Sequence, residues 1–393
     1  MYQQGRYVTD VRVGRMPRVT VVKAAFWSAA GLLVYAHVGY PLVLEVLGRV
    51  RRARGATLPG AERPRVSLIV AAHREAEVIE GKVANARALD WPPEQLEIIV
   101  ACDGSPDDTA ARARAAGADV VLELPWGGKV RAQDAAVQRA TGELLAFSDA
   151  NALWERDALR ALAAPFADPA VGYACGQVRF VGDDGGNQEG LYWRYEMAIR
   201  ARESQLASVT AGNGAIYAVR PEAYLNVDPV MGHDLSFPFN MVKRGWRAVY
   251  APDAKATEKM VPTVEGEFQR KRRMMSHAWP IVLRGGLLSP NGYTPVYALM
   301  IVSHRALRYA APFLHLLALV ANAALLRRGP LYVATFAAQT AVVGAAAAGR
   351  AVRAKPLLIA RYYVLTTASV AAGLYDYLRH GTPAGWAPPE GTR

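Results

Sequence analysis

Two aspartates stand at the ends of apolar, strand-like segments, where they could bind a metal ion together with a phosphorylated ligand. Asp149 ends the run 144–148, and Asp103 ends the run 96–102. Strands that alternate with helices build an open parallel sheet, and such sheets bind ligands in the crevice beyond the carboxyl ends of their strands. Two carboxylates at that edge suit a nucleotide and its metal ion, and a third carboxylate, Asp234, follows later in the chain. The pattern indicates an enzyme.

A lysine between these aspartates could bind an anion. Lys129 follows Gly127 and Gly128, which let a backbone approach a phosphate, and it stands at a predicted helix start. A helix start beside an ammonium group is a ready anion site, although a solvated surface lysine is the alternative. Asp234 also stands at a predicted helix start, where it could act as a base or simply complement the helix dipole.

The elements that must position these residues alternate regularly between strand and helix. Predicted strands cover 65–72, 96–102, 118–124 and 143–148, and predicted helices cover 75–89, 105–117 and 130–140. The first strand is β-branched and apolar throughout, as in a fully buried parallel strand. Ser105 and Asp108 are predicted to form a capping box at the start of the second helix. The pattern predicts a doubly wound α/β unit.

Beyond residue 151 the alternation is looser. The predicted elements are a loop at 182–186, a helix at 192–204, a strand at 215–219, a helix from 234 to 245 and a strand at 247–250. A basic segment with apolar residues at helical spacing follows from 265 to about 288, and such a helix can lie in the plane of lipid headgroups.

Composition indicates a membrane protein. Of 393 residues, 52% are hydrophobic, and 46 basic against 34 acidic residues give a net charge of +12. Nucleic acid is one partner for such an excess, but the basic residues gather beside apolar runs, which favours an anionic membrane surface. The two cysteines, Cys102 and Cys175, lack metal-ligand spacing, which fits a reducing compartment without a disulfide framework or a zinc site.

Four apolar runs are long enough to span a bilayer, which needs about 20 residues. They are residues 24–47, 309–326, 331–348 and 357–378, and the alternative is a set of buried helices in a large soluble protein. Arginines at 49, 51, 52 and 54 place the segment after the first run in the cytoplasm by the positive-inside rule. Basic residues at 12, 15, 18 and 23 flank the other end and weaken that rule, so the side of the carboxyl terminus stays open.

An ordered set of short motifs carries a resemblance to a known family. The motifs are Ala71-Ala72-His73-Arg74-Glu75, Asp103-Gly104-Ser105-Pro106-Asp107-Asp108-Thr109, Gly127-Gly128-Lys129, Asp149-Ala150-Asn151, His233-Asp234 and Gln269-Arg270-Lys271-Arg272-Arg273. With them the chain resembles membrane-bound, inverting family 2 glycosyltransferases of the GT-A fold, over residues 65–273. It is similar to their polysaccharide-synthase branch, which makes poly-N-acetylglucosamine, hyaluronan or cellulose.

The resemblance implies a fold class and a domain order. The fold class is α/β, a Rossmann-like GT-A nucleotide-diphosphosugar transferase domain with about four transmembrane helices, one before it and three after it. The expected parts are an N-terminal tail 1–23, a transmembrane helix 24–47, a catalytic domain 63–263, an interfacial amphipathic helix 264–288, a three-helix transmembrane region 296–378 and a C-terminal tail 379–393.

For the donor, the resemblance implies roles at the carboxyl edge of the sheet. Ala71 and Glu75 would hold the uracil ring, unless they are ordinary loop and helix-start residues, and Asp103 would bind the nucleotide rather than cap a helix. Asp149 resembles the first aspartate of the metal-binding DxD motif, and Mg²⁺ or Mn²⁺ would join it to the diphosphate. Asn151 stands where the second aspartate is expected, and its carbonyl oxygen could bind the metal or the sugar.

For the acceptor, Asp234 resembles the catalytic base of the inverting reaction, and His233 precedes it where an acidic residue is common. The run Gln269–Arg273 aligns with the QxxRW signature of processive synthesis, but Arg273 replaces the tryptophan. A diphosphate clamp could survive through Arg270 or Arg272, whereas the processive acceptor platform is in doubt. A basic face lying on lipid is the alternative for Lys271 and Arg273.

These implications predict a metal-dependent inverting transferase in the cell (inner) membrane, multi-pass, with its catalytic domain in the cytoplasm. It would move a hexose or N-acetylhexosamine from a UDP-sugar to a growing envelope or capsular polysaccharide. The runner-up is a single addition to a lipid-linked acceptor. Membrane lipids are expected partners, nucleic acid is not, and the resemblance leaves room for an accessory subunit. A non-catalytic membrane scaffold is less well supported because Asp149 and Asp234 are both present. A transporter is disfavoured because three trailing runs cannot form a symmetric repeat with one leading run.

Overall fold

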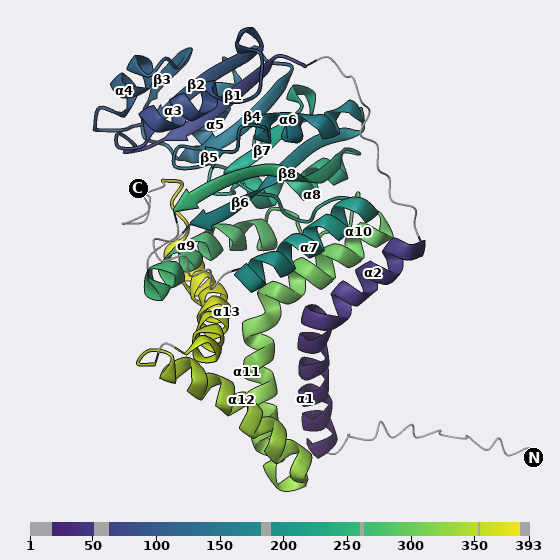
Figure 1. Cartoon of the computed structure of the whole chain (residues 1–393). Coiled ribbons are helices and arrows are strands. Elements are labelled where there is room, and N and C mark those ends of the chain that lie inside the picture. The colour runs from purple at the N-terminus through teal and green to yellow at the C-terminus, as the bar shows by residue number, and fades with distance from the viewer. Residues whose placement is uncertain (1–17, 51–62, 182–189, 260–262, 353, 386–393) are drawn as a thin grey trace, which may run out of the picture.

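The structure, a computed structural model, describes residues 18–50, 63–181, 190–259, 263–352 and 354–385. An α/β domain lies at one end of the molecule, and long helices extend away from it at the other end (Figure 1). The predicted loop at 182–186 lies outside the described residues. The predicted fold class, an α/β domain together with apolar helices, is confirmed.

The first half of the domain is the predicted parallel unit. Its strands are β1 (Val66–Ala72), β2 (Leu96–Asp103), β3 (Val120–Leu124) and β4 (Leu144–Asp149). Its helices are α3 (Ile79–Arg87), α4 (Thr109–Ala115) and α5 (Lys129–Val137). All residues of β1 are buried because the strand is central and helices cover both of its faces.

The second half extends the sheet with both antiparallel and parallel pairings. Its strands are β5 (Leu153–Trp154), β6 (Val171–Val181), β7 (Ile216–Val219) and β8 (Arg247–Lys259), and the sheet order is β3-β2-β1-β4-β7-β6-β8-β5. β7 pairs antiparallel with β4 and β6, and β6 pairs parallel with β8. Its helices are α6 (Ala158–Ala163), α7 (Gly190–Leu206), α8 (His233–Lys243) and α9 (Val264–Leu283). Short 3₁₀ turns lie at Pro93–Gln95, Ala164–Ala167 and Pro221–Ala223.

β7 pairs with β4 in the antiparallel direction, and this pairing joins the two halves of the sheet. It brings the segment after α7 and the start of α8 to the edge where β1, β2 and β4 end. The sequence analysis missed β5 and β6 and gave β8 too short a range. Residues from both halves of the domain therefore meet at one edge.

Four helical segments are long and apolar enough to cross a membrane: Arg18–Arg49, Pro295–Arg328, Pro330–Ala348 and Lys355–His380. The first comprises α1 (Arg18–Val34), a π-helical turn (Tyr35–Gly39) and α2 (Tyr40–Val50). The second comprises α10 (Pro295–Met300), a π-helical turn (Ile301–Ala306), α11 (Leu307–Leu325) and a 3₁₀ turn (Leu326–Arg328). The others are α12 (Pro330–Ala348) and α13 (Lys355–His380). One such segment precedes the α/β domain and three follow it, as predicted.

The predicted capping box is wrong. α4 begins at Thr109, and the Ser105 hydroxyl accepts a hydrogen bond from the Arg74 amide at 2.9 Å instead of capping a helix. Asp107 occupies the helix start, where its carboxylate accepts from the Thr109 hydroxyl at 2.6 Å. The side chain of Ser105 therefore ties together the two loops that follow β1 and β2.

Candidate active site

Lys129 and Asp149 form an ion pair at the carboxyl edge of the sheet. β4 delivers Asp149, and the first residue of α5 delivers Lys129. Burial lowers the pKa of Lys129, but the Asp149 carboxylate outweighs burial, and the net pKa is raised. The lysine is therefore a charged ammonium that neutralises Asp149. It is not the solvated surface residue that the sequence left as an alternative.

The turn after β4 carries the second residue of the candidate metal motif. Ala152 donates its amide to the Asp149 carbonyl at 3.2 Å, which closes the turn around a half-buried Asn151. Ala71 lies beside this turn, because it pairs with Asp149 in the register of β1 and β4. A residue as small as alanine leaves room at this point of the edge.

Asp103 organises the loop in front of α5. Its two carboxylate oxygens accept the amides of Gly127 at 2.7 Å and Gly128 at 2.9 Å. The residue is 3% exposed, so its charge is satisfied by these amides rather than by water. The carboxylate thereby fixes the backbone that places Lys129. This contact lies at the start of α5, so Asp103 does not cap α4, the helix that follows it in the chain.

Asp234 lies opposite Lys129 across Gly214. A Cβ built on Gly214 would be 3.7 Å from the Lys129 Nζ and 3.8 Å from the Asp234 Cβ. Asp234 stands in the first turn of α8, and its carbonyl accepts the Gly212 amide at 2.6 Å. Gly214, which has no side chain, therefore lies between the Lys129 ammonium and the Cβ of Asp234. The structure places Asp149, Lys129 and Asp234 near one another.

His233 does not share this position. Its Nδ1 lies 2.8 Å from the Tyr217 hydroxyl, and its ring stacks on Phe237 with a centroid distance of 4.0 Å. Burial, together with the charge of Lys129, lowers the pKa of His233 to about 3. The imidazole is a neutral member of the aromatic core, so the predicted acceptor contact is not supported by its place in the fold.

Glu258, near the end of β8, is a carboxylate that the sequence analysis missed. Burial and the neighbouring Asp149 carboxylate raise the pKa of Glu258 to about 7. Two carboxylates that disfavour each other's charge mark a place where a cation would be stabilised. Mg²⁺ and Mn²⁺ prefer oxygen ligands, which these carboxylates and the Asn151 amide provide. The residues thus fit a divalent cation that also binds a diphosphate.

The basic residues of α9 divide between two faces. Arg272 forms two hydrogen bonds of 2.6 Å with Asp376 of α13, so it ties α9 to the membrane region. Arg270 pairs with Glu267 at 2.7 Å and contributes charge at Glu258, while Gln269 is exposed. Of the two predicted diphosphate-clamp arginines, the structure places Arg270 toward the site and Arg272 away from it.

Arg273 and His277 lie one helical turn apart on α9. Burial lowers the pKa of His277, and among the charges on its ring Arg273 lowers that pKa while Asp234 raises it. Nδ1 of His277 lies 3.1 Å from the Val230 carbonyl oxygen. This face of α9 therefore approaches the Asp234 carboxylate. The sequence analysis did not single out His277, although its spacing of four from Arg273 was a usable signal.

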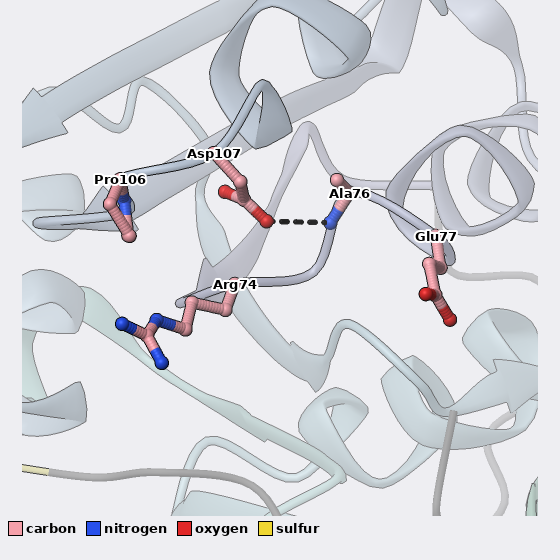
Figure 2. A pocket seen from close by; sticks show the side chains of 5 residues that line it. All are labelled: Arg74, Ala76, Glu77, Pro106 and Asp107. Atoms are coloured by element: carbon pink, nitrogen blue, oxygen red, sulfur yellow. Dashed lines mark hydrogen bonds between the residues drawn. The ribbon is translucent and has the colours of Figure 1, made fainter.

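A shallow pocket of about 280 Å³ lies between the loops that follow β1 and β2 (Figure 2). Arg74, Ala76, Glu77, Pro106 and Asp107 line it, and the Ala76 amide donates to Asp107 at 3.4 Å. Arg74 has a φ of +56°, the left-handed region, which turns the chain sharply after β1. The pocket does not include Asp149 or Asp234, so we assign it to the rim of the site.

Glu75 lies behind this rim. It is 2% exposed, and its amide donates to the Thr109 hydroxyl at 3.0 Å. Its carbonyl accepts the amides of Val78 and Ile79, which begins the turn into α3. Glu75 therefore has a local structural role at this rim. It is also one of the two residues predicted to hold the uracil ring.

Residues 381–385, here called the C-terminal strap, run from the end of α13 to the loop in front of α5 (Figure 1). The Thr382 hydroxyl donates to the Ser276 carbonyl at 2.8 Å. A Cβ on Gly128 would collide with the carbonyl of Ala384, and Gly385 packs against the indole of Trp126. The strap thus covers the backbone that Asp103 binds.

Comparison with known proteins relates the chain that forms this site to a protein family. A family model described as Glycosyl transferase family 2 matches residues 67–223. An N-acetylglucosaminyltransferase from Rhizobium sp. (strain N33) is 26% identical over 231 residues, which are 53% of this chain and 51% of the relative. A beta-monoglucosyldiacylglycerol synthase from Synechocystis sp. is 28% identical over 236 residues, 52% of this chain and 47% of the relative. The chain spans about half the length of these curated relatives.

A solved structure shares the fold more extensively. The mannosyltransferase PcManGT from Pyrobaculum calidifontis, in complex with GDP-Man and Mn²⁺, has a TM-score of 0.70 and 24% sequence identity. The match covers 92% of this chain and 99% of that chain, so the shared fold includes apolar helices as well as the α/β domain.

The family match includes Asp103, Lys129 and Asp149, the residues that meet at the carboxyl edge of β2 and β4. Asp234 lies beyond the matched residues, but β7 and α8 bring it to the same edge. The chain therefore carries a glycosyl transferase family 2 domain with a GT-A-like fold, on a chain whose described residues include four helices able to cross a membrane.

Proposed function

We propose that this protein is an inverting, metal-dependent glycosyltransferase that uses a nucleotide-sugar donor at a membrane surface. The observation that carries the proposal is the convergence of Asp149, Lys129 and Asp234 around Gly214. A cation-binding carboxylate, an ammonium for phosphate and a further carboxylate for proton transfer are the groups that such a reaction needs.

On the donor side, Lys129 would bind the diphosphate, because an ammonium at a helix start favours an anion, and Asp103 would hold the loop 127–128 that positions this lysine. Asp149 would hold Mg²⁺ or Mn²⁺, with Glu258 and Asn151 beside it. When bound, that cation supplies charge stabilisation for the departing nucleoside diphosphate. Lys129 must leave Asp149 in this state, and the diphosphate would replace Asp149 as its anionic partner.

On the acceptor side, Asp234 would take the proton of the attacking hydroxyl. An inverting transfer needs one carboxylate on the face of the sugar opposite the leaving group. Gly214 separates Asp234 from Lys129, which leaves a place for the sugar between base and diphosphate. Arg273 and His277 on α9 would border the acceptor, since the charges of both Arg273 and Asp234 act on the pKa of His277.

For the donor base we keep the prediction of a UDP-sugar carrying a hexose or N-acetylhexosamine. The sugars named in the relatives' descriptions, N-acetylglucosamine and glucose, agree with it. GDP-mannose belongs in any donor panel because it is bound in the solved structure that shares the fold.

For the acceptor, the sequence put a growing polysaccharide first and a lipid-linked acceptor second, and the structure supports the second. Arg273 replaces the aromatic residue of the processive signature, and Arg272 is bound to Asp376 of α13 rather than facing the site. One curated relative is named for a diacylglycerol product. We therefore propose a single addition to a membrane-borne acceptor, with the catalytic domain on the cytoplasmic face of the cell membrane.

The test uses the full chain in nanodiscs with Mn²⁺ or Mg²⁺, labelled UDP- and GDP-sugars, and a lipid extract as acceptor. One discrete lipid-soluble product is the expected result. A ladder or a high-mass polymer would restore the polysaccharide synthase. Release of free sugar without any transfer product, or no donor consumption at all, would contradict the proposed transferase.

A further inference from the structure

Lys82 on α3 is a fully buried lysine beneath the candidate active site. Its side chain is 0% exposed, and its Nζ donates to the Ala152 carbonyl at 2.7 Å. Nζ also lies 5.2 Å from the centroid of the Trp154 ring. Burying an amine is costly unless hydrogen bonds or nearby opposite charges replace its lost hydration.

The acceptor of this hydrogen bond belongs to the turn that carries the candidate metal ligand. The same Ala152 donates its amide to the carbonyl of Asp149, so Lys82 holds the closing residue of the turn Asp149–Ala152. Lys82 and the turn are 70 residues apart in the sequence, and the fold alone brings them together.

One helical turn along α3, Asn85 holds the next part of the same segment. Its side-chain amide donates to the Trp154 carbonyl at 2.9 Å, and its side-chain oxygen accepts the Trp154 amide at 2.9 Å. Asn85 fixes the backbone five residues beyond Asp149, whereas Lys82 fixes it three residues beyond. The two side chains provide a matched pair of contacts at different distances from the site.

Lys82 and Lys129 reach Asp149 from opposite faces of the sheet. α3 packs in the core on one face, with Val83 and Trp154, and α5 packs in the core on the other, with Ala132 and Ala136. Burial lowers the pKa of Lys82 to about 7 despite the nearby carboxylates of Asp149 and Glu258. The Lys129 side chain is partly exposed, whereas Lys82 is fully enclosed.

We propose that Lys82 is a positioning residue for glycosyl transfer, whose Nζ holds the turn Asp149–Asn151 in the geometry that binds the metal and the donor. This inference rests on the proposed function for its effect on turnover. Its effect on the turn itself does not depend on any activity. Lys82 touches the backbone of the turn and acts on the reaction through Asp149.

The test compares Lys82→Met, which removes the donor group, with Lys82→Gln, which keeps a hydrogen-bond donor without the charge, and with Asn85→Ala. Hydrogen exchange of the peptide that contains residues 149–154 is measured in the unliganded full chain. Mn²⁺-dependent nucleotide binding, kcat and KM are measured on the same preparations in nanodiscs.

We expect Lys82→Met to speed exchange at the Ala152 amide and to weaken Mn²⁺-dependent binding and kcat on the order of 10- to 100-fold, as loss of a supporting contact does. Lys82→Gln should recover part of both effects. Asn85→Ala should lower thermal stability at least as much as Lys82→Met while leaving kcat within about threefold, because its contacts lie beyond the turn.

Two outcomes overturn the inference. One is unchanged exchange and turnover in Lys82→Met. The other is a loss of kcat in Asn85→Ala that matches Lys82→Met, since general loosening would then explain both. If the parent protein shows no transfer while Lys82→Met still speeds exchange at Ala152, the proposed function fails and the positioning role stands. If Lys82→Met does not fold, Lys82→Gln alone decides, by the same exchange and kcat measurements.

Discussion

The ammonium group of Lys129 forms an ion pair with the Asp149 carboxylate in the unliganded protein, so the lysine and a metal ion compete for the same oxygen atoms. Lys129→Met should therefore tighten Mn²⁺ binding measured without nucleotide, by about tenfold if the pair contributes about 1.4 kcal/mol. The same variant should lose donor turnover because the diphosphate has lost its ammonium. Calorimetric titration with Mn²⁺ checks the first part, and Asp149→Ala, which should show no such binding, is the control. Unchanged or weaker Mn²⁺ binding in Lys129→Met would contradict the competition.

Asp234→Asn should abolish transfer while donor binding persists. Asn keeps the size of the side chain but cannot accept the acceptor proton, and loss of a general base costs on the order of 10²- to 10⁴-fold in rate. The measurement is kcat for transfer beside the Kd for UDP in the presence of Mn²⁺. Asp253→Asn, an exposed position on β8, serves as the control. Turnover of Asp234→Asn within a few-fold of the parent would remove Asp234 as the base.

Glu258→Gln should weaken Mn²⁺-dependent nucleotide binding on the order of tenfold or more, because it removes one of the two carboxylates that would share the cation. Glu258 is the strongest candidate for this second role, since the burial and charge around it raise its pKa to about 7. Asp253→Asn, at an exposed carboxylate on the same strand β8, is the control. A Mn²⁺ titration of Glu258→Gln that superimposes on that of the parent argues against Glu258 as a ligand.

His233 should make the fold sensitive to acid. The folded protein holds His233 neutral, with a pKa of about 3 against 6.5 for an ordinary histidine. The unfolded chain binds a proton below about 6.5 and the folded chain does not, so this contribution to stability is complete above pH 6.5 and declines as the pH falls toward 3. We expect the drop in Tm between pH 7.5 and pH 5 to be smaller in His233→Gln than in the parent. His380→Gln, at an exposed histidine, should leave that drop unchanged.

Arg272 and Asp376 should behave as a structural pair between α9 and α13. Arg272→Met and Asp376→Asn should each lower stability by about 0.5–1 kcal/mol, and the double variant should be no worse than the single ones. Both should keep the parent's affinity for UDP and Mn²⁺. A loss of UDP affinity in Arg272→Met that Asp376→Asn does not share would instead support Arg272 as a diphosphate clamp.

The sequence was sufficient for features that depend on local pattern. Apolar periodicity located β1 to β4 to within two residues, and the polar residues that end β2 and β4 marked the edge where the site lies. Ser105 was assigned wrongly because its hydroxyl is bound by Arg74, a partner 31 positions away that no local pattern reveals.

Nonlocal contacts also explain what the sequence left out. The shifted pKa values of Glu258 and Lys82 result from their burial near Asp149. In the sequence alone, each is an ordinary charged residue of a strand or helix. β6 was missed although most of its residues are buried, because its continuous apolar run is ambiguous between strand and helix. His233 packs in the aromatic core while Asp234 lies beside Gly214, and the packing of α8 determines which residue takes which place. The motif His233-Asp234 alone does not distinguish these two environments.

The C-terminal strap has a consequence for the sidedness of the protein. Because residues 382–385 lie on the loop before α5, the strap end of α13 lies against the α/β domain, so the three apolar segments that follow this domain cannot all be complete crossings of a bilayer. A fluorescent or enzymatic reporter joined behind this strap would therefore share its compartment with the sugar-nucleotide pool if the transferase works as proposed. The same reporter would lie close to the loop in front of α5, so an amino-terminal fusion is the better choice for purification.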